Sequence, residues 1–165
     1  MTAKILIVMR HAKSSWKTSN PDFARPLSAR GTRDAVIAGQ VLAPFHLDLV
    51  LSSASTRTRQ TWQCLTMGGA KASDVRFSET IYHAWTNDVI DELRGVEAGV
   101  KTTLLLGHEP TVSDLISTLA QPSELVDQVA AHFPTSAIGI LSFDGPWAEL
   151  GADSAVLQRF EIPRG

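Results

Sequence analysis

This sequence of 165 residues has little cysteine, no large excess of charge of one sign and few long hydrophobic runs. Cys64 is the only cysteine, so no disulfide can form within the chain, which fits a reducing compartment. The 15 lysines and arginines are nearly balanced by 17 aspartates and glutamates. The chain therefore lacks the basic excess expected of a protein that binds nucleic acid or an anionic membrane.

The longest apolar run near the N-terminus, Ile5 to Met9, is too short for a signal-peptide core or a membrane span, and Arg10 ends it. We therefore expect a soluble, unprocessed protein of the cytoplasm. A hydrophobic share of 44% over this length is enough for one core. We expect a single domain over residues 1–165.

Short apolar runs alternate with helix-like stretches along the chain. The apolar runs predict strands at Ile5–Met9, Leu47–Leu51, Thr103–Leu106, Ile138–Phe143 and Val156–Ile162. The stretches between them predict helices at Ser28–Leu42, Ser55–Met67, Thr86–Arg94 and Thr111–Leu119. This order predicts an α/β fold, a three-layer α/β/α sandwich with a mainly parallel sheet. The last two strands, on either side of a turn at residues 144–146, are expected to add an antiparallel edge.

Arginines and histidines follow three of the predicted strands. Arg10 and His11 end the first, Arg57 comes shortly after the second, and His108 comes after the third. Ligands of open α/β sheets bind beyond the carboxyl ends of the strands, where these side chains would converge. The sequence therefore predicts an anion site. The other three histidines are expected to be structural or surface residues: His46, His83 and His132.

Three other kinds of phosphate chemistry lack their residues here. A thiol mechanism needs an arginine in a Cys-x₅-Arg loop, and Ala70 stands at that position after Cys64. Metal-assisted hydrolysis would place carboxylates or histidine clusters at the strand ends, which here carry arginines. No Walker loop ending in Gly-Lys-Ser/Thr is present. We expect neither a metal nor another cofactor.

Three segments, residues 10–17, 52–61 and 107–110, resemble the signatures of the histidine phosphatase superfamily, also called phosphoglycerate mutase-like. The family's Arg-His-Gly-Glu-Ser-x-Trp-Asn reads Arg-His-Ala-Lys-Ser-Ser-Trp-Lys in this chain. Its Ser-Ser-x-x-x-Arg-Ala-x-Gln-Thr reads Ser-Ser-Ala-Ser-Thr-Arg-Thr-Arg-Gln-Thr, which selects Arg57 over Arg59, and its Gly-His-x-Pro reads Gly-His-Glu-Pro. Ala12, residues 22–27 and residues 135–138 make the chain most similar to the short SixA-type phosphohistidine phosphatases.

The resemblance implies a metal-independent phosphatase that carries the phosphoryl group covalently on His11. Arg10, Arg57 and a protonated His108 would stabilise the transferred group. Lys17 and Arg25 would help to bind phosphate or substrate, although Lys17 stands where longer members have asparagine. The implied partner is a phosphorylated protein of the histidine phosphotransfer type or a small phosphorylated metabolite.

The general acid stays open at this point. Glu79 lies where the family often keeps its proton donor, and Asp22 and Glu109 are alternatives. A phosphohistidine substrate would need less help from an acid. Alternative functions are a phosphatase of small phosphomonoesters, a phosphoglycerate-type mutase, for which the chain has few residues to build a lid, and a phosphate-binding module without turnover.

Overall fold

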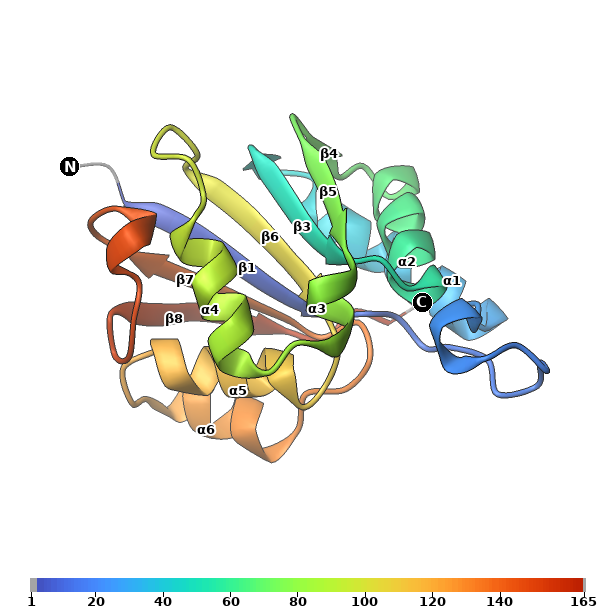
Figure 1. Cartoon of the computed structure of the whole chain (residues 1–165). Helices are drawn as coiled ribbons and strands as arrows, with labels where there is room; N and C mark the ends of the chain where they lie inside the picture. Colours follow the sequence, from blue (N-terminus) through green and yellow to red (C-terminus); the bar gives the residue numbers. More distant parts are fainter. Residues whose placement is uncertain (1–2, 165) are drawn as a thin grey trace.

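A computed structural model describes residues 3–164, which fold around a six-stranded sheet (Figure 1). The strand order is β5-β3-β6-β1-β7-β8. In chain order the strands are β1 (Lys4–Arg10), β3 (Leu49–Ser53), β5 (Val75–Ser78), β6 (Thr102–Gly107), β7 (Ile138–Phe143) and β8 (Ala155–Glu161). β5, β3, β6 and β1 are parallel, whereas β7 pairs antiparallel with both β1 and β8. The predicted mainly parallel sheet with an antiparallel edge is confirmed: the β7–β8 pair forms that edge.

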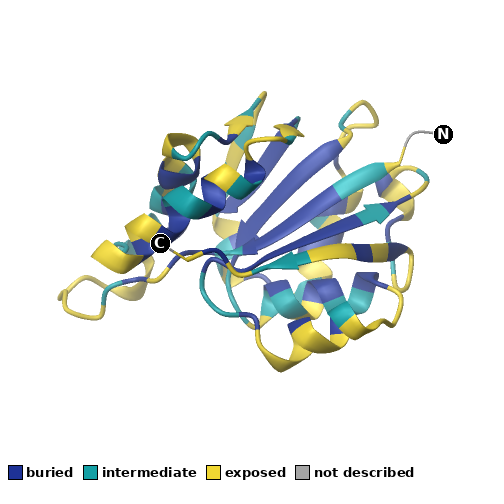
Figure 2. Ribbon diagram, turned by 180° about the vertical axis from the view of Figure 1, so that it is seen from behind, coloured by how far each residue is buried: buried dark blue, intermediate teal, exposed yellow. Residues whose placement is uncertain are grey.

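Helices cover both faces of the sheet, as expected for three layers (Figure 1). One face packs on α1 (Ala29–Leu42) and α2 (Thr56–Met67). The other packs on α3 (Glu79–His83), α4 (Thr86–Arg94), α5 (Thr111–Leu119) and α6 (Glu124–Ala131). Successive residues of β1 enter opposite cores, Leu6 and Val8 on the second face and Ile7 and Met9 on the first. The central strands are dark blue in Figure 2 because they are buried on both sides.

Several elements were not predicted from the sequence. β5, α3 and α6 are short, and their apolar patterns gave no distinct signal. The predicted strand Leu47–Leu51 is divided into β2 (His46–Leu47) and β3, and β2 pairs with β4 (Lys71–Ala72) in a separate small sheet. Asp48 separates the two strands because its carboxylate accepts hydrogen bonds from the backbone N–H groups of Lys101 and Thr102, each at 3.0 Å.

The connection between β7 and β8 is longer than the predicted three-residue turn. It spans residues 144–154 and contains the short 3₁₀ helix Trp147–Glu149. Trp147 is 1% exposed and packs edge-on against Phe143, so this connection closes one end of a core. Among the helices of residues 3–164, none combines the length and the apolar character that a bilayer crossing requires.

Glycines allow α1 and α2 to pack closely. A Cβ atom on Gly39 would lie 2.2 Å from the carbonyl oxygen of Leu65, and one on Gly68 would lie 2.1 Å from that of Val36. Both obstacles are backbone atoms, which cannot move away without displacing a helix. α2 carries Arg57 in its first turn, so this helix contact also determines where that guanidinium lies.

We predict that Gly39→Ala lowers the free energy of unfolding by about 1–3 kcal/mol, because the added methyl group forces the two helices apart. Urea denaturation checks the value. The control is Gly99→Ala, since a Cβ atom at exposed Gly99 meets nothing within 4 Å. Equal stability of the two variants would contradict the role of this contact.

Candidate active site

The pairing of β1 with β6 brings the two predicted histidines together. Arg10, the last residue of β1, lies opposite Gly107, the last residue of β6. The backbone N–H of His11 donates to the carbonyl of Gly107 at 3.0 Å, and the carbonyl of His11 accepts from Ser136 N–H at 3.0 Å. The ring centroids of His11 and His108 are consequently 5.2 Å apart. Residues separated by almost one hundred positions thus share one rim of the sheet.

The environment of His11 fixes its tautomer. Its Nδ1 lies 2.6 Å from the carbonyl oxygen of Ala12, which can only accept, so Nδ1 carries the proton. Nε2 is therefore left with a lone pair. Burial is the main cause that lowers the pKa of His11 to about 3, and the positive charges of Arg57 and Arg10 act in the same direction. At neutral pH the imidazole is uncharged and suited to nucleophilic attack.

Arg57 is placed by its own helix and by Asp22. The Thr61 hydroxyl donates to the carbonyl of Arg57 at 2.7 Å and accepts from the N–H of Ala12 at 3.0 Å, which links α2 to the loop after β1. Arg57 as a whole is 6% exposed. Its Nη1 donates to the backbone carbonyl of Asp22 at 2.8 Å, and its Nη2 donates to the Asp22 carboxylate at 3.1 Å.

Asp22 is the centre of a hydrogen-bond cluster behind the site. Its carboxylate also accepts from the Tyr82 hydroxyl at 2.6 Å and from Arg25 Nε at 3.2 Å. The Tyr82 bond is the largest cause that lowers the pKa of Asp22 to about 2, and Arg57 and Arg25 contribute. Asp22 is thus ionised at neutral pH and holds both arginines in place, which argues against it as the proton donor.

His108 completes the group. Its Nε2 lies 2.7 Å from the Ser53 hydroxyl, and its ring packs edge-on against Tyr82. Burial, followed by the charge of Arg57, lowers the pKa of His108 to about 4. Without phosphate, His108 is therefore neutral at neutral pH, because desolvation and neighbouring cations disfavour a further positive charge. A protonated His108 beside a bound phosphoryl group stays a prediction.

A cavity of about 260 Å³ opens between these side chains, lined by Arg10, His11, Arg25, Arg57 and His108. Three of these lining residues have a buried side-chain nitrogen without a hydrogen-bond partner within residues 3–164: Arg10 Nε, Arg57 Nε and His108 Nδ1. Buried donors normally have a partner. Two arginines and a second imidazole line the same cavity as the free imidazole nitrogen of His11, and such a set of side chains matches the oxygens of a phosphoryl group.

The two residues predicted to bind phosphate or substrate, Lys17 and Arg25, lie in different hollows. Lys17 lines a neighbouring groove rather than this cavity, and Lys13 and Ser14 line the cavity instead. Lys13 stands in the first signature, directly after Ala12, but its charge was not used as a signal. Arg25 is where it was expected, and its Nη1 donates to the Ser14 hydroxyl at 2.7 Å.

The three candidate acids differ in position. Glu79 begins α3, is exposed and lines a separate cavity with Phe23, Tyr82 and His83. Only Glu109 lines the phosphate-sized cavity, and its carboxylate accepts from the N–H and the hydroxyl of Ser113, each at 2.8 Å. No group of three or more His, Cys, Asp or Glu side chains among the described residues is arranged to hold a metal ion.

Comparisons with known proteins agree with this geometry. The sequence model of a family described as "Histidine phosphatase superfamily (branch 1)" matches residues 6–133. Uncharacterized protein Rv1276c of Mycobacterium tuberculosis is 40% identical over 162 residues, which cover 94% of this chain and all of that protein. Two solved structures are also similar, and both are described as candidate phosphohistidine phosphatases SixA.

The first of these structures, from Nakamurella multipartitia, has 30% identity and a TM-score of 0.89 over 99% of this chain and 98% of that one. The second, from Agrobacterium tumefaciens, has 26% identity and a TM-score of 0.79 over 97% and 98%. The chain therefore belongs to the histidine phosphatase superfamily, and it is a phosphatase with a SixA-like fold. The predicted resemblance is confirmed.

The lowered histidine pKa values predict an acid-sensitive fold. The unfolded chain takes up protons on histidine near pH 6.5, whereas buried His11 resists protonation down to about pH 3. The free energy of unfolding should thus fall as the pH decreases from 6.5 toward 3. Urea denaturation at pH 7 and pH 5 should show a smaller loss for His11→Asn than for the wild type. Equal losses would contradict the low pKa.

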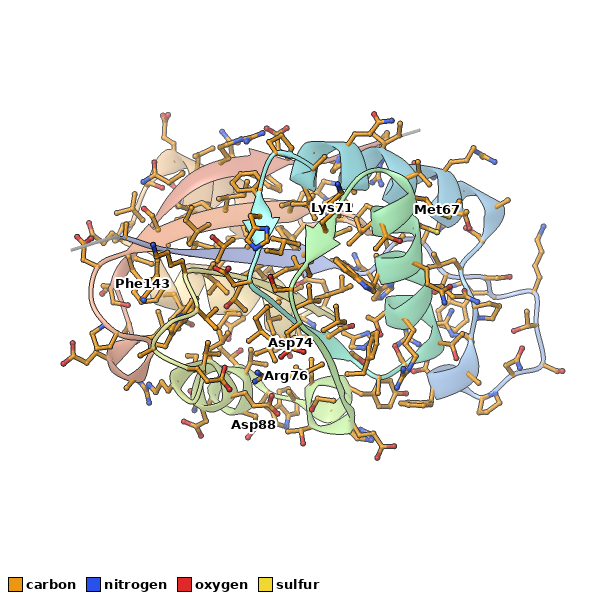
Figure 3. All side chains as sticks on the ribbon, turned by 90° about the horizontal axis from the view of Figure 1, so that it is seen from above. Met67, Lys71, Asp74, Arg76, Asp88 and Phe143 are labelled. Carbon is orange, nitrogen blue, oxygen red and sulfur yellow. The ribbon has the colours of Figure 1, made fainter. Side chains whose placement is uncertain are left out.

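The Asp22 cluster predicts a positioning role. Asp22→Asn keeps the side-chain size but removes the charge that orients Arg57 and Arg25, and we expect kcat/KM for p-nitrophenyl phosphate to fall about tenfold. The control is Asp74→Asn, which removes a carboxylate bonded to exposed Arg76 at 2.9 Å (Figure 3). A loss no larger than that of the control would show that Asp22 does not order the arginines.

Proposed function

We propose that this phosphatase removes the phosphoryl group from phosphohistidine on a protein, through a covalent intermediate on His11. The observation that carries the proposal is the buried, uncharged His11, whose ring has an unprotonated Nε2 and shares one cavity with Arg10, Arg57 and His108. A nucleophile of this kind needs no base to activate it. The similarity to two structures of candidate phosphohistidine phosphatases SixA supports the choice of substrate.

In the first step Nε2 of His11 attacks phosphorus and forms an N–P bond, while the N–P bond of the substrate breaks. The electron pair of the broken bond stays on the substrate nitrogen. A substrate ring protonated on its other nitrogen then leaves as neutral histidine, so no proton is required. His11 becomes a positively charged ring that bears the phosphoryl group. Bonds and charge balance because one imidazole replaces another.

In the second step water attacks phosphorus and the N–P bond to His11 breaks. Its electron pair returns to Nε2, and the products are neutral His11 and dihydrogen phosphate, which loses a proton to the solvent. Arg10 and Arg57 stabilise the charge on the phosphoryl oxygens in both steps. Arg57 is suited to this because Asp22 fixes its guanidinium before substrate arrives.

The position of the acids also supports phosphohistidine. Glu79 faces another cavity and Asp22 is ionised, so neither is placed to protonate a departing alkoxide. A leaving imidazole does not need this proton. Glu109 is the observation that favours a second candidate, hydrolysis of small phosphomonoesters, because its carboxylate lines the cavity and would have to act as the acid.

The proposal predicts that His11→Ala reduces turnover of a phosphohistidine peptide by about 10³-fold or more, because no other group replaces the nucleophile. The variant should keep the fold. Brief mixing of the wild type with the peptide in EDTA should leave a phosphoryl group on His11, which mass spectrometry locates. His132→Ala is the control, since that histidine is exposed at the end of α6.

Other outcomes would separate the alternatives. A phosphoryl group on a residue other than His11, or a requirement for metal, would overturn the mechanism. Faster turnover of sugar phosphates than of the peptide would favour the second candidate. Transfer of the phosphoryl group to a second hydroxyl of the same substrate would indicate a mutase, and binding of phosphate with no turnover at any pH would indicate a binding module.

A further inference from the structure

A groove joins the cavity that His11 and His108 line. It has a volume of about 660 Å³ and lies between residues 13–18 and residues 26–30, which lead into α1. The two hollows share Lys13, Ser14 and Trp16 as lining residues. The segment between β1 and α1 projects from the body of the fold (Figure 1), and its residues 16–23 are exposed (Figure 2). A substrate seated on His11 would extend into this groove.

Backbone contacts hold the walls of the groove together. Ser15 N–H donates to the carbonyl of Pro26 at 2.8 Å, and Ser28 N–H donates to the carbonyl of Lys13 at 2.9 Å. A Cβ atom on Gly31 would lie 2.0 Å from the Lys13 carbonyl oxygen, so only glycine permits this approach. Although the segment projects, its base is fastened to α1 and the groove is preformed.

Trp16 stands at the junction of the two hollows with 76% of its surface exposed. The guanidinium of Arg25 lies 3.5 Å from the centroid of its ring. Arg25 itself is buried and bonded to Ser14 and Asp22, so the ring rests on a fixed support. An ordered, exposed tryptophan loses little entropy on binding, which is typical of residues that dominate protein interfaces.

Charge distinguishes this groove from the opposite side of the site. Its lining contains the cations Lys13, Lys17 and Arg30 and no carboxylate. Arg30 lies 3.6 Å from Asp34, so its charge is partly offset, whereas neither lysine has an ion pair among the described residues. Glu109 lies on the other side, where the cavity meets a hollow near Trp85. The groove is therefore the positive side of the site.

We infer that this groove binds an acidic, extended segment next to the phosphohistidine of a partner protein, which deepens and rests on the proposed function. Carboxylates of the segment pair with Lys13 and Lys17, and an apolar side chain packs on the free face of Trp16. Lys17 thus acts on the substrate beyond the phosphoryl group. Charge complementarity of this kind selects partners more than it adds affinity.

Two synthetic phosphohistidine peptides test the inference, identical except that glutamates or lysines flank the phosphohistidine. For the wild type we expect kcat/KM to be about five- to tenfold higher for the glutamate peptide at low salt, and the ratio to shrink as salt is added. Lys17→Glu should bring the ratio to about one or below. Because the ratio compares two substrates of the same enzyme, differences in folded fraction cancel.

The matched control is Lys71→Glu, an identical change of charge on exposed β4 (Figure 3). β4 pairs with β2, which precedes β3, so Lys71 lies near the end of the sheet opposite the site. The wild-type ratio should survive in this variant. A wild-type ratio near one, or a wild-type ratio that Lys17→Glu keeps, would contradict the inferred role of the groove but not the proposed function. If the enzyme hydrolyses p-nitrophenyl phosphate but neither peptide, both proposals fail.

Discussion

The parallel pairing of β1 with β6 is the constraint on which the site depends. Both strands are buried on the two faces of the sheet, so their register is fixed by two cores at once. Their carboxyl ends therefore coincide, and the polar residues that follow have to emerge at the same place. A slip of one residue would exchange the faces of β1 and would also separate the nucleophile candidate from its neighbour.

Placing several cationic or basic side chains at one buried rim is unfavourable without compensation. The protein resolves this in two ways. The imidazoles of His11 and His108 remain uncharged, and the carboxylate of Asp22 neutralises part of the arginine charge. The resting site is thus positive enough to attract a phosphoryl dianion and still compatible with a folded core.

The sequence predicted the fold class and four residues that meet at the rim. Strand ends can be located from apolar runs, and parallel strands have their carboxyl ends at the same edge of the sheet. It did not predict the role of Asp22, since hydrogen bonds to Tyr82 and Arg57 join segments whose proximity only the fold reveals. The sequence also did not indicate that Lys17 lines the neighbouring groove and not the cavity, because that depends on how the loop after β1 folds beside the residues that lead into α1. Charge and motif position cannot indicate which way a projecting loop folds.

The carboxylate of Asp22 also affects which anions the site binds weakly. Arg57 and Arg25 already have a carboxylate partner, so a second singly charged carboxylate would gain little from them. A phosphoryl dianion gains more, because it has a second charge and three equivalent oxygens for Arg10 and His108, which line the same cavity. The common organic acids of a cell would therefore compete weakly for this site, although its net charge alone would favour their binding.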